Sequence, residues 1–237
     1  MALGLLGSKK LSNPVTISSF QQIQFSPLIP LLNMAITLQK RGDKHQINLS
    51  KEQKVQLKVD VNLNWNSGEA KSTGLFGKLF GGGAAAAAPD LDLGCMYELN
   101  DGSKGVIQPL GNNFGSLTKP PFIFLDKDDR TGGAADGENM AIVRPDTIKR
   151  VMVFALIYAG AKDFRTVNGR MHFKISNGEE IKLELNNPGE NQIFCAAALI
   201  QFTEAGIVMT KEERYFNGHS AADNHYGFGF RWTAGSK

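Results

Sequence analysis

The sequence predicts an all-β protein in which two antiparallel sheets pack face to face as a sandwich. Residues 55 to 65 alternate apolar and polar side chains, which is typical of a strand with one buried face. Other apolar runs are separated by Asn-Gly and Asp-Gly pairs, which favour hairpins because their central residues take positive φ. No segment has the pattern of a convincing amphipathic helix. Many short strands without helices favour a two-sheet sandwich.

The chain before the first strand is interpreted as an N-terminal appendage or arm. Residues 1 to 33 contain three prolines, which break any long helix. The pattern of strands starts at residue 34, so we expect one β-sandwich domain over 34 to 237. Within that domain, residues 68 to 89 include three consecutive glycines and five alanines, which predicts a flexible Gly/Ala-rich insertion.

Several of the expected strands are separated by turn signals. Turns are predicted at Asp101-Gly102, Asn168-Gly169, Asn177-Gly178 and Pro188-Gly189. The expected strands cover 36–38, 55–65, 91–99, 105–110, 151–159, 165–167, 171–176, 179–185, 193–202, 207–216 and 226–232.

Composition excludes several classes of protein. The 237 residues are 42% apolar and 21% charged, and 26 Lys and Arg against 23 Asp and Glu give a net charge of +3. This excess is too small to predict nucleic-acid binding. The first residues place their charge after a short apolar stretch, unlike a secretory signal peptide, and no run of about 18 apolar residues indicates a membrane helix. We therefore expect a cytoplasmic protein.

An acidic, glycine-rich loop is the strongest chemical feature of the sequence. It runs from Asp126 to Asn139 and reads Asp-Lys-Asp-Asp-Arg-Thr-Gly-Gly-Ala-Ala-Asp-Gly-Glu-Asn. Ca²⁺ takes roughly six to eight oxygen ligands, and glycine lets the backbone turn tightly enough to present them. Asp90 and Asp92 open an apolar run and are candidates to supply ligands from across the fold. Such loops are also ordinary solvated turns, and the order of residues excludes an EF-hand.

Other reactive residues give weaker signals. Cys95 and Cys195 lie in apolar segments, which predicts inert core thiols, and the sequence leaves a disulfide between them open. His219, Asp223 and His225 suggest a transition-metal or acid-base site, but a polar loop that joins the last two strands is the favoured interpretation. The glycine pairs lack the spacing of phosphate-binding and dinucleotide-binding motifs, so no nucleotide site is predicted.

Several motifs resemble the tellurium-resistance family whose members carry a TerD domain. The segment from Met34 to Gly42, Met-Ala-Ile-Thr-Leu-Gln-Lys-Arg-Gly, is similar to the opening strand of that family. Leu63-Asn64-Trp65 is similar to its Leu-Gly-Trp strand, and Asp90-Leu91-Asp92 to its Asp-Leu-Asp signature. Residues 128 to 139 resemble its acidic-glycine calcium loop. The resemblance spans 34 to 237.

Within the family, the TerA branch is the most similar, through residues 92 to 99 and 214 to 232. The resemblance implies a two-sheet antiparallel β-sandwich with calcium-binding loops that hold two neighbouring Ca²⁺ ions. It also implies a role in resistance to tellurite, phage or chemical stress, and association with other Ter-family proteins, some of them at the membrane. Carried over position by position, it gives the candidate metal ligands Asp90, Asp92, Asp128, Asp129, Asp136, Glu138 and Asn139.

Two departures from the family pattern predict weaker calcium binding or the loss of one site. Gly133, Ala134 and Ala135 replace a more acidic stretch, and Met140 stands where a further acid is expected. Calcium affinity depends on the number of charged ligands, so fewer carboxylates lower it.

The sequence supports three hypotheses of function. We expect a non-enzymatic calcium-binding stress-response protein that acts as an interaction scaffold. The main alternative is a self-assembling structural protein that lays its N-terminal arm along a neighbour's sheet edge and so forms a homo-oligomer. An enzyme that acts on tellurite or another oxyanion would need accessible low-pKa thiols or a redox cofactor, and cysteines in apolar strands do not offer them.

Overall fold

The computed structural model describes residues 35 to 66, 88 to 128, 137 to 186 and 191 to 235. All of them belong to one structural unit, Asn33–Lys237. The predicted arm at 1 to 33 and nearly all of the predicted insertion at 68 to 89 lie outside the described residues, and both stay predictions.

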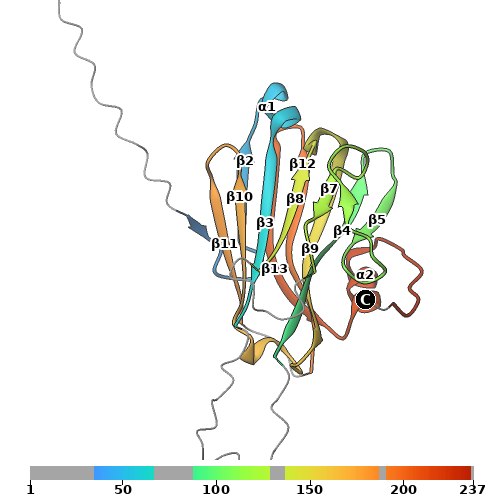
Figure 1. Ribbon diagram of the computed structural model, residues 1–237. Helices are drawn as coiled ribbons and strands as arrows, with labels where there is room; N and C mark the ends of the chain where they lie inside the picture. Colours follow the sequence, from blue (N-terminus) through green and yellow to red (C-terminus); the bar gives the residue numbers. More distant parts are fainter. Residues whose placement is uncertain (1–34, 67–87, 129–136, 187–190, 236–237) are drawn as a thin grey trace, which may run out of the picture. The chain divides into compact units, whose positions relative to one another are not determined.

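Two sheets build the domain, consistent with the predicted β-sandwich (Figure 1). The seven-stranded sheet has the order β1 (Ile36–Thr37), β11 (Glu180–Leu185), β10 (Gly169–Ile175), β3 (Lys58–Asn64), β8 (Glu138–Val143), β7 (Ile123–Leu125), β6 (Gly115–Ser116). The six-stranded sheet has the order β2 (Lys44–Asn48), β13 (Gly206–Phe216), β12 (Phe194–Thr203), β9 (Ile148–Ala159), β4 (Asp90–Leu99), β5 (Lys104–Ile107). Only β1 and β11 pair in parallel among these strands.

The core lies between the two sheets and follows the alternation of the strands. In β3 the side chains of Val59, Val61 and Leu63 are buried, whereas the residues between them are partly exposed. They share one apolar cluster with Leu93 and Cys95 of β4 in the other sheet. Each large apolar side chain that is buried in this way stabilises the fold by about 1.5 to 3 kcal/mol. This shared cluster holds the sheets together.

The outer face of the six-stranded sheet is covered by the C-terminal segment. Helix α2 (His219–Tyr226) and the residues after it contribute Ala222 and Phe228 to a second apolar cluster. That cluster includes Met152 and Phe154 of β9, which face away from the first core. Strand β9 is therefore buried on both faces, in agreement with its uninterrupted apolar run from Val151 to Ile157.

The helices correct three sequence predictions. The expected strand at 55–65 begins only at Lys58, because helix α1 (Lys51–Gln56) precedes it. Ser50 starts α1 with a capping box: its hydroxyl accepts from the Gln53 amide at 3.2 Å, and the Gln53 side chain accepts from the Ser50 amide at 2.8 Å. The expected strand at 165–167 is the 3₁₀ helix η2 (Phe164–Thr166), which Asp163 caps.

The expected strand at 226–232 was also wrong, as was the polar loop expected at 219–225. Residues 219 to 226 form α2, and no strand occurs at 227 to 232. The carboxylate of Asp223 accepts hydrogen bonds from the amides of Gly229 and Phe230 at 2.7 and 2.8 Å and from the indole of Trp232 at 2.9 Å. These bonds hold the aromatic segment against the sheet face instead of leaving it free to join the sheet edge.

Candidate metal centre

Two buried aspartates open strand β4. Asp90 is 6% exposed and Asp92 is 1% exposed, and their spacing of two residues puts both side chains on one face of the strand. The indole of Trp65 anchors the entry to β4, because its Nε1 donates to the carbonyl of Pro89 at 2.9 Å. The start of β4 is therefore held by Trp65, the residue that directly follows β3.

A third carboxylate comes from a distant part of the sequence. Asp128 follows β7, and one oxygen from each of Asp90, Asp92 and Asp128 lies within 4.8 Å of the others. At this distance two ionised carboxylates repel each other by about 3 to 4 kcal/mol at the effective dielectric typical of protein surfaces. The fold thus brings together three of the seven predicted ligands at a cost that a cation would offset.

Glu138 joins the two sheets near the start of β4, but its carboxylate is not one of the three that cluster. It is the first residue of β8, its side chain is fully buried, and its Oε2 accepts a hydrogen bond from the amide of Leu93 at 2.6 Å. Gly137 allows the backbone to enter β8 at Glu138. It has a φ of +60°, and a Cβ at this residue would lie 2.1 Å from the carbonyl oxygen of Leu63. The predicted ligand Glu138 is therefore held next to the strand that carries Asp92.

Asn139 points to the opposite face of β8. It alternates with the buried Glu138, and its Nδ2 and backbone amide both donate to the carboxylate of Asp126 at 3.1 Å. Its Oδ1 accepts from Asn62 at 2.9 Å. The side chain of Asn139 thus binds Asp126 and Asn62 on the face of β8 opposite to Glu138. The last two predicted ligands, Asp129 and Asp136, lie outside the described residues.

The donor set of the cluster fits a hard cation. Carboxylate oxygens suit Ca²⁺ and Mg²⁺, whereas Zn²⁺ and copper sites are typically built from thiolates and imidazoles. Among the described residues, this is the one group of three or more acidic, His or Cys side chains close enough to share an ion. The residues present therefore agree with the class of metal that the sequence predicts.

The alternative metal site that the sequence suggested, at His219, Asp223 and His225, lies in and around helix α2. His219 packs against the rings of Phe154, Phe194 and Trp232, and its Nε2 lies 2.7 Å from the Gln108 side-chain oxygen. Burial lowers the pKa of His219 to about 4. Asp223 binds the aromatic segment, so these side chains serve the packing of α2.

Both cysteines are buried and free, as the sequence predicts for core thiols. Burial raises the pKa of Cys95 to about 12, and burial also raises the pKa of Cys195, with Glu213 adding to the effect. A thiolate is the reactive form of cysteine, so neither thiol is poised for redox chemistry near neutral pH.

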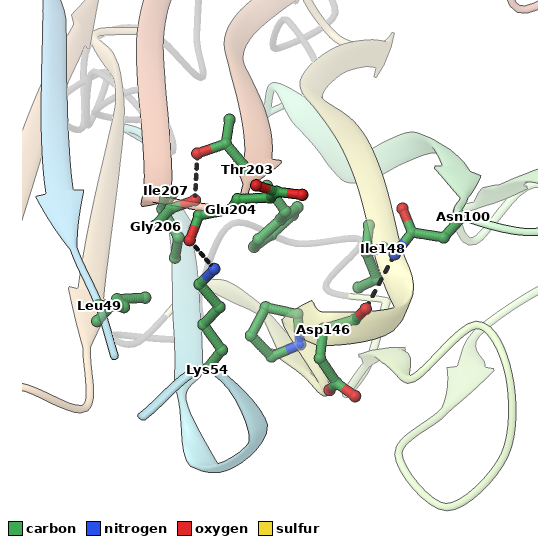
Figure 2. Close-up of a pocket in the computed structure, with 11 residues that line it drawn as sticks. Leu49, Lys54, Asn100, Asp146, Ile148, Thr203, Glu204, Gly206 and Ile207 are labelled. Atoms are coloured by element: carbon green, nitrogen blue, oxygen red, sulfur yellow. Dashed lines mark hydrogen bonds between the residues drawn. The ribbon is translucent and has the colours of Figure 1, made fainter. Parts of the chain in front are cut away.

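A hollow lies beside Asn100, next to the C-terminal end of strand β4 (Figure 2). It has a volume of about 260 Å³, and Asn100, which follows β4, lies in its wall. Its polar groups bind one another: Lys54 donates to the carbonyl of Glu204, and Asn100 donates to the carbonyl of Asp146 at 2.9 Å. We interpret this hollow as a packing gap where α1, the 3₁₀ helix η1 (Pro145–Thr147) and the β12–β13 hairpin meet.

In the part of the chain that the structure describes, no helix is long and apolar enough to cross a membrane.

Comparison with known proteins then identifies the family. No protein-family model matches the chain. The tellurium resistance protein TerA of an Alcaligenes species is 35% identical over 197 residues, which is 82% of this chain. The chain spans 57% of the length of that relative. This identity shows that the chain belongs to the tellurium-resistance family and is related to its TerA branch.

Proposed function

We propose that this chain is a non-enzymatic, calcium-binding protein of resistance to tellurite, phage or chemical stress, and that it acts as an interaction scaffold. The convergence of Asp90, Asp92 and Asp128 within 4.8 Å carries the calcium part of the proposal. The relationship to TerA, itself named a tellurium resistance protein, supports the part that concerns stress resistance.

A divalent ion at this cluster would stabilise the folded chain. It would offset the repulsion among the carboxylates and tie the segment after β7 to the start of β4. A ligand that binds only the folded form adds RT ln(1 + [L]/Kd), or about 2.7 kcal/mol at a hundredfold excess over Kd. Ca²⁺ takes more oxygens than three side chains provide, and we propose Asp129, Asp136 and Glu138 as sources of the others.

The proposed partners are other Ter-family proteins, including partners at a membrane. A second copy of this chain is the alternative partner, with the arm at 1 to 33 as the exchanged segment. Size-exclusion chromatography of the full chain and of a chain that lacks residues 1 to 33 separates the two: self-assembly through the arm requires a smaller particle after truncation, and an unchanged size contradicts it.

Calorimetric titration of the metal-free protein tests the calcium proposal. We expect saturable heat from CaCl₂, weaker heat from MgCl₂ because Mg²⁺ dehydrates reluctantly, and at least a tenfold loss of calcium affinity in Asp128→Asn. Asp128→Asn keeps the shape of the side chain and removes its charge.

Asp101→Asn is the matched control. Asp101 lies in the exposed turn after β4, where its side chain accepts from the Ser103 amide at 2.9 Å, and an asparagine oxygen can accept the same bond. Equal calcium affinities in the two variants, or no calcium heat in the parent protein, would contradict the proposal.

A further inference from the structure

The outer face of the seven-stranded sheet carries a polar trough across β8, β3, β10 and β11. Two adjacent hollows form it, with volumes of about 500 and 280 Å³, and both are lined by Asn62, Asn64 and His172. Strand register places Asn139, Asn62, His172 and Lys182 in one row straight across the four strands. The trough is thus built on paired strands, independently of the acidic cluster.

The floor of the trough offers no apolar anchor point. Val61, Met171 and Leu183 contribute to its lining, but each is at most 1% exposed because its side chain points into the core. Protein partners usually bind through aromatic or aliphatic side chains that fill pockets. A peptide ligand is therefore disfavoured on this face.

Amide side chains in the trough are held in place by hydrogen bonds. Asn62 donates to the Oδ1 of Asn139 at 2.9 Å. Arg170 donates to the Oδ1 of Asn64 and, at 3.3 Å, to the Oδ1 of Asn66. These bonds fix the orientation of the guanidinium before any ligand arrives, and such preorganisation lowers the cost of binding.

The lining of the trough carries three cations, Arg170, Lys174 and Lys182, against two acids, Asp60 and Glu184. With the residues that the structure describes, Arg170, Lys174 and Lys182 make no ion pair. Asp60 is paired with Lys58 at 2.7 Å, and the strand register places Lys174 between Asp60 and Glu180. Glu184 lies opposite Arg170 in the strand register and limits the basic stretch at that side. The trough therefore favours a ligand that carries a few negative charges, rather than a polyanion.

We propose that this trough binds an acidic saccharide, a hydroxyl-rich ligand with carboxylate groups. Each hydroxyl both donates and accepts hydrogen bonds, as each side-chain amide does. The Nη1 of Arg170 donates to Asn66 and Asn168 and its Nη2 to Asn64, so the Nε hydrogen and the second Nη2 hydrogen form the fork that matches a carboxylate. A single inorganic anion would occupy only a small part of this volume.

Titration of the full chain with trigalacturonate tests the proposal. We expect saturable heat, at least a tenfold loss of affinity in Arg170→Gln, and a similar loss in Lys182→Gln. The side chain of Lys182 makes no hydrogen bond or ion pair with the described residues, so that variant disturbs no such contact. Lys51→Gln is the matched control, since it removes an exposed charge on α1, outside the trough, and its affinity should equal that of the parent.

Two further probes separate the saccharide from other anionic ligands. A neutral galactose trisaccharide should bind at least tenfold more weakly than trigalacturonate, and tetraglutamate, which has charge without hydroxyls, should also bind at least tenfold more weakly. Absence of heat with trigalacturonate, equal binding of tetraglutamate, or equal affinity in all three variants would overturn the proposal. Melting curves of each variant confirm that the fold is kept.

Discussion

Strand β4 carries buried carboxylates at both ends, and their surroundings differ. At Glu98, the Nζ of Lys149 lies 2.8 Å from one oxygen and the Nε of Arg150 lies 2.7 Å from the other. At the start of the strand, Asp90 and Asp92 meet Asp128 within 4.8 Å. One end joins an acid to two bases, and the other gathers acids. This contrast is why we propose a cation site at the start of β4 and find a structural ion pair at its end.

Removal of the acid at Glu98 should have the largest effect among the following variants. Glu98→Gln leaves Lys149 and Arg150 without their carboxylate, and charge-assisted hydrogen bonds of this kind contribute about 2 to 3 kcal/mol together. Urea unfolding at pH 7 measures the loss. An unchanged free energy of unfolding would show that the ion pair at this end of β4 contributes nothing.

The pH dependence of the same variant sharpens the comparison. The hydrogen bond from Lys149 holds the pKa of Glu98 below its usual value of 4.5, against the opposing effect of burial. A carboxyl with a lowered folded-state pKa stabilises the protein above pH 4.5, and this contribution is lost as the pH falls below that value. Glu98→Gln should remove that part of the acid sensitivity.

His219 provides a second contrast, because the cause of its pKa shift is burial rather than a charged partner. Its pKa falls from 6.5 to about 4 through burial, so the unfolded chain takes up the proton first as the pH drops. Stability is therefore complete above pH 6.5 and is lost toward pH 4. We expect a loss of about 2 kcal/mol between pH 7 and pH 5, measured by urea unfolding. His219→Phe should flatten this slope, and an equally steep slope in the variant would exclude His219 as its source.

Gly137→Ala should have a smaller effect, confined to the acidic end. A non-glycine residue at a φ of +60° is strained, and its Cβ would press on the carbonyl of Leu63, so we expect a loss of about 1 to 2 kcal/mol. Because Gly137 sets the position of Glu138, calcium affinity should fall as well. Gly102→Ala is the control, since Gly102 also has positive φ but nothing lies within 4 Å of an added Cβ. Equal calcium affinities in Gly137→Ala and Gly102→Ala would show that the position of Gly137 does not affect calcium binding.

The thiols should give the smallest effect. Cys95 lies in the middle of β4 and Cys195 in β12, and both are fully buried. A thiol reagent at pH 8 should label neither cysteine in the native protein and both in urea. Rapid labelling of the native form would reopen the hypothesis of redox chemistry on tellurite.

Local signals predicted much of this fold, and long-range packing accounts for the rest. Asn177-Gly178 fixed the β10–β11 hairpin because Gly178 takes a φ of +97°. The segment at 226–232 alternates glycine and aromatic residues like a strand, but the buried Asp223 instead binds it over the outer face of the six-stranded sheet. Alternation alone cannot tell a strand from an aromatic cover, because both present apolar side chains to a sheet.

In the candidate metal site too, local sequence signals predicted one part and long-range packing determines the other. The composition of the loop at 126 to 139 predicts a hard cation, and Asp90 and Asp92 were candidates to supply ligands from across the fold. No spacing in the sequence shows that Asp128 is the loop residue that meets them, because that contact depends on the packing of the two sheets. The alternation of β8 separates Glu138 from Asn139, although they are neighbours in sequence. Strand β8 itself was not expected, since its first two residues were assigned to the loop. The trough on the outer face depends on side chains from four strands and has no local signature.

The most direct test compares the two ends of β4 with and without calcium. Melting temperatures of the parent protein, Asp92→Asn and Glu98→Gln are measured in EDTA and in excess CaCl₂. The account predicts that calcium raises the melting temperature of the parent and of Glu98→Gln by several degrees and leaves Asp92→Asn nearly unchanged. An equal calcium response in Asp92→Asn, or no response in the parent, would contradict the assignment of a cation to the acidic end.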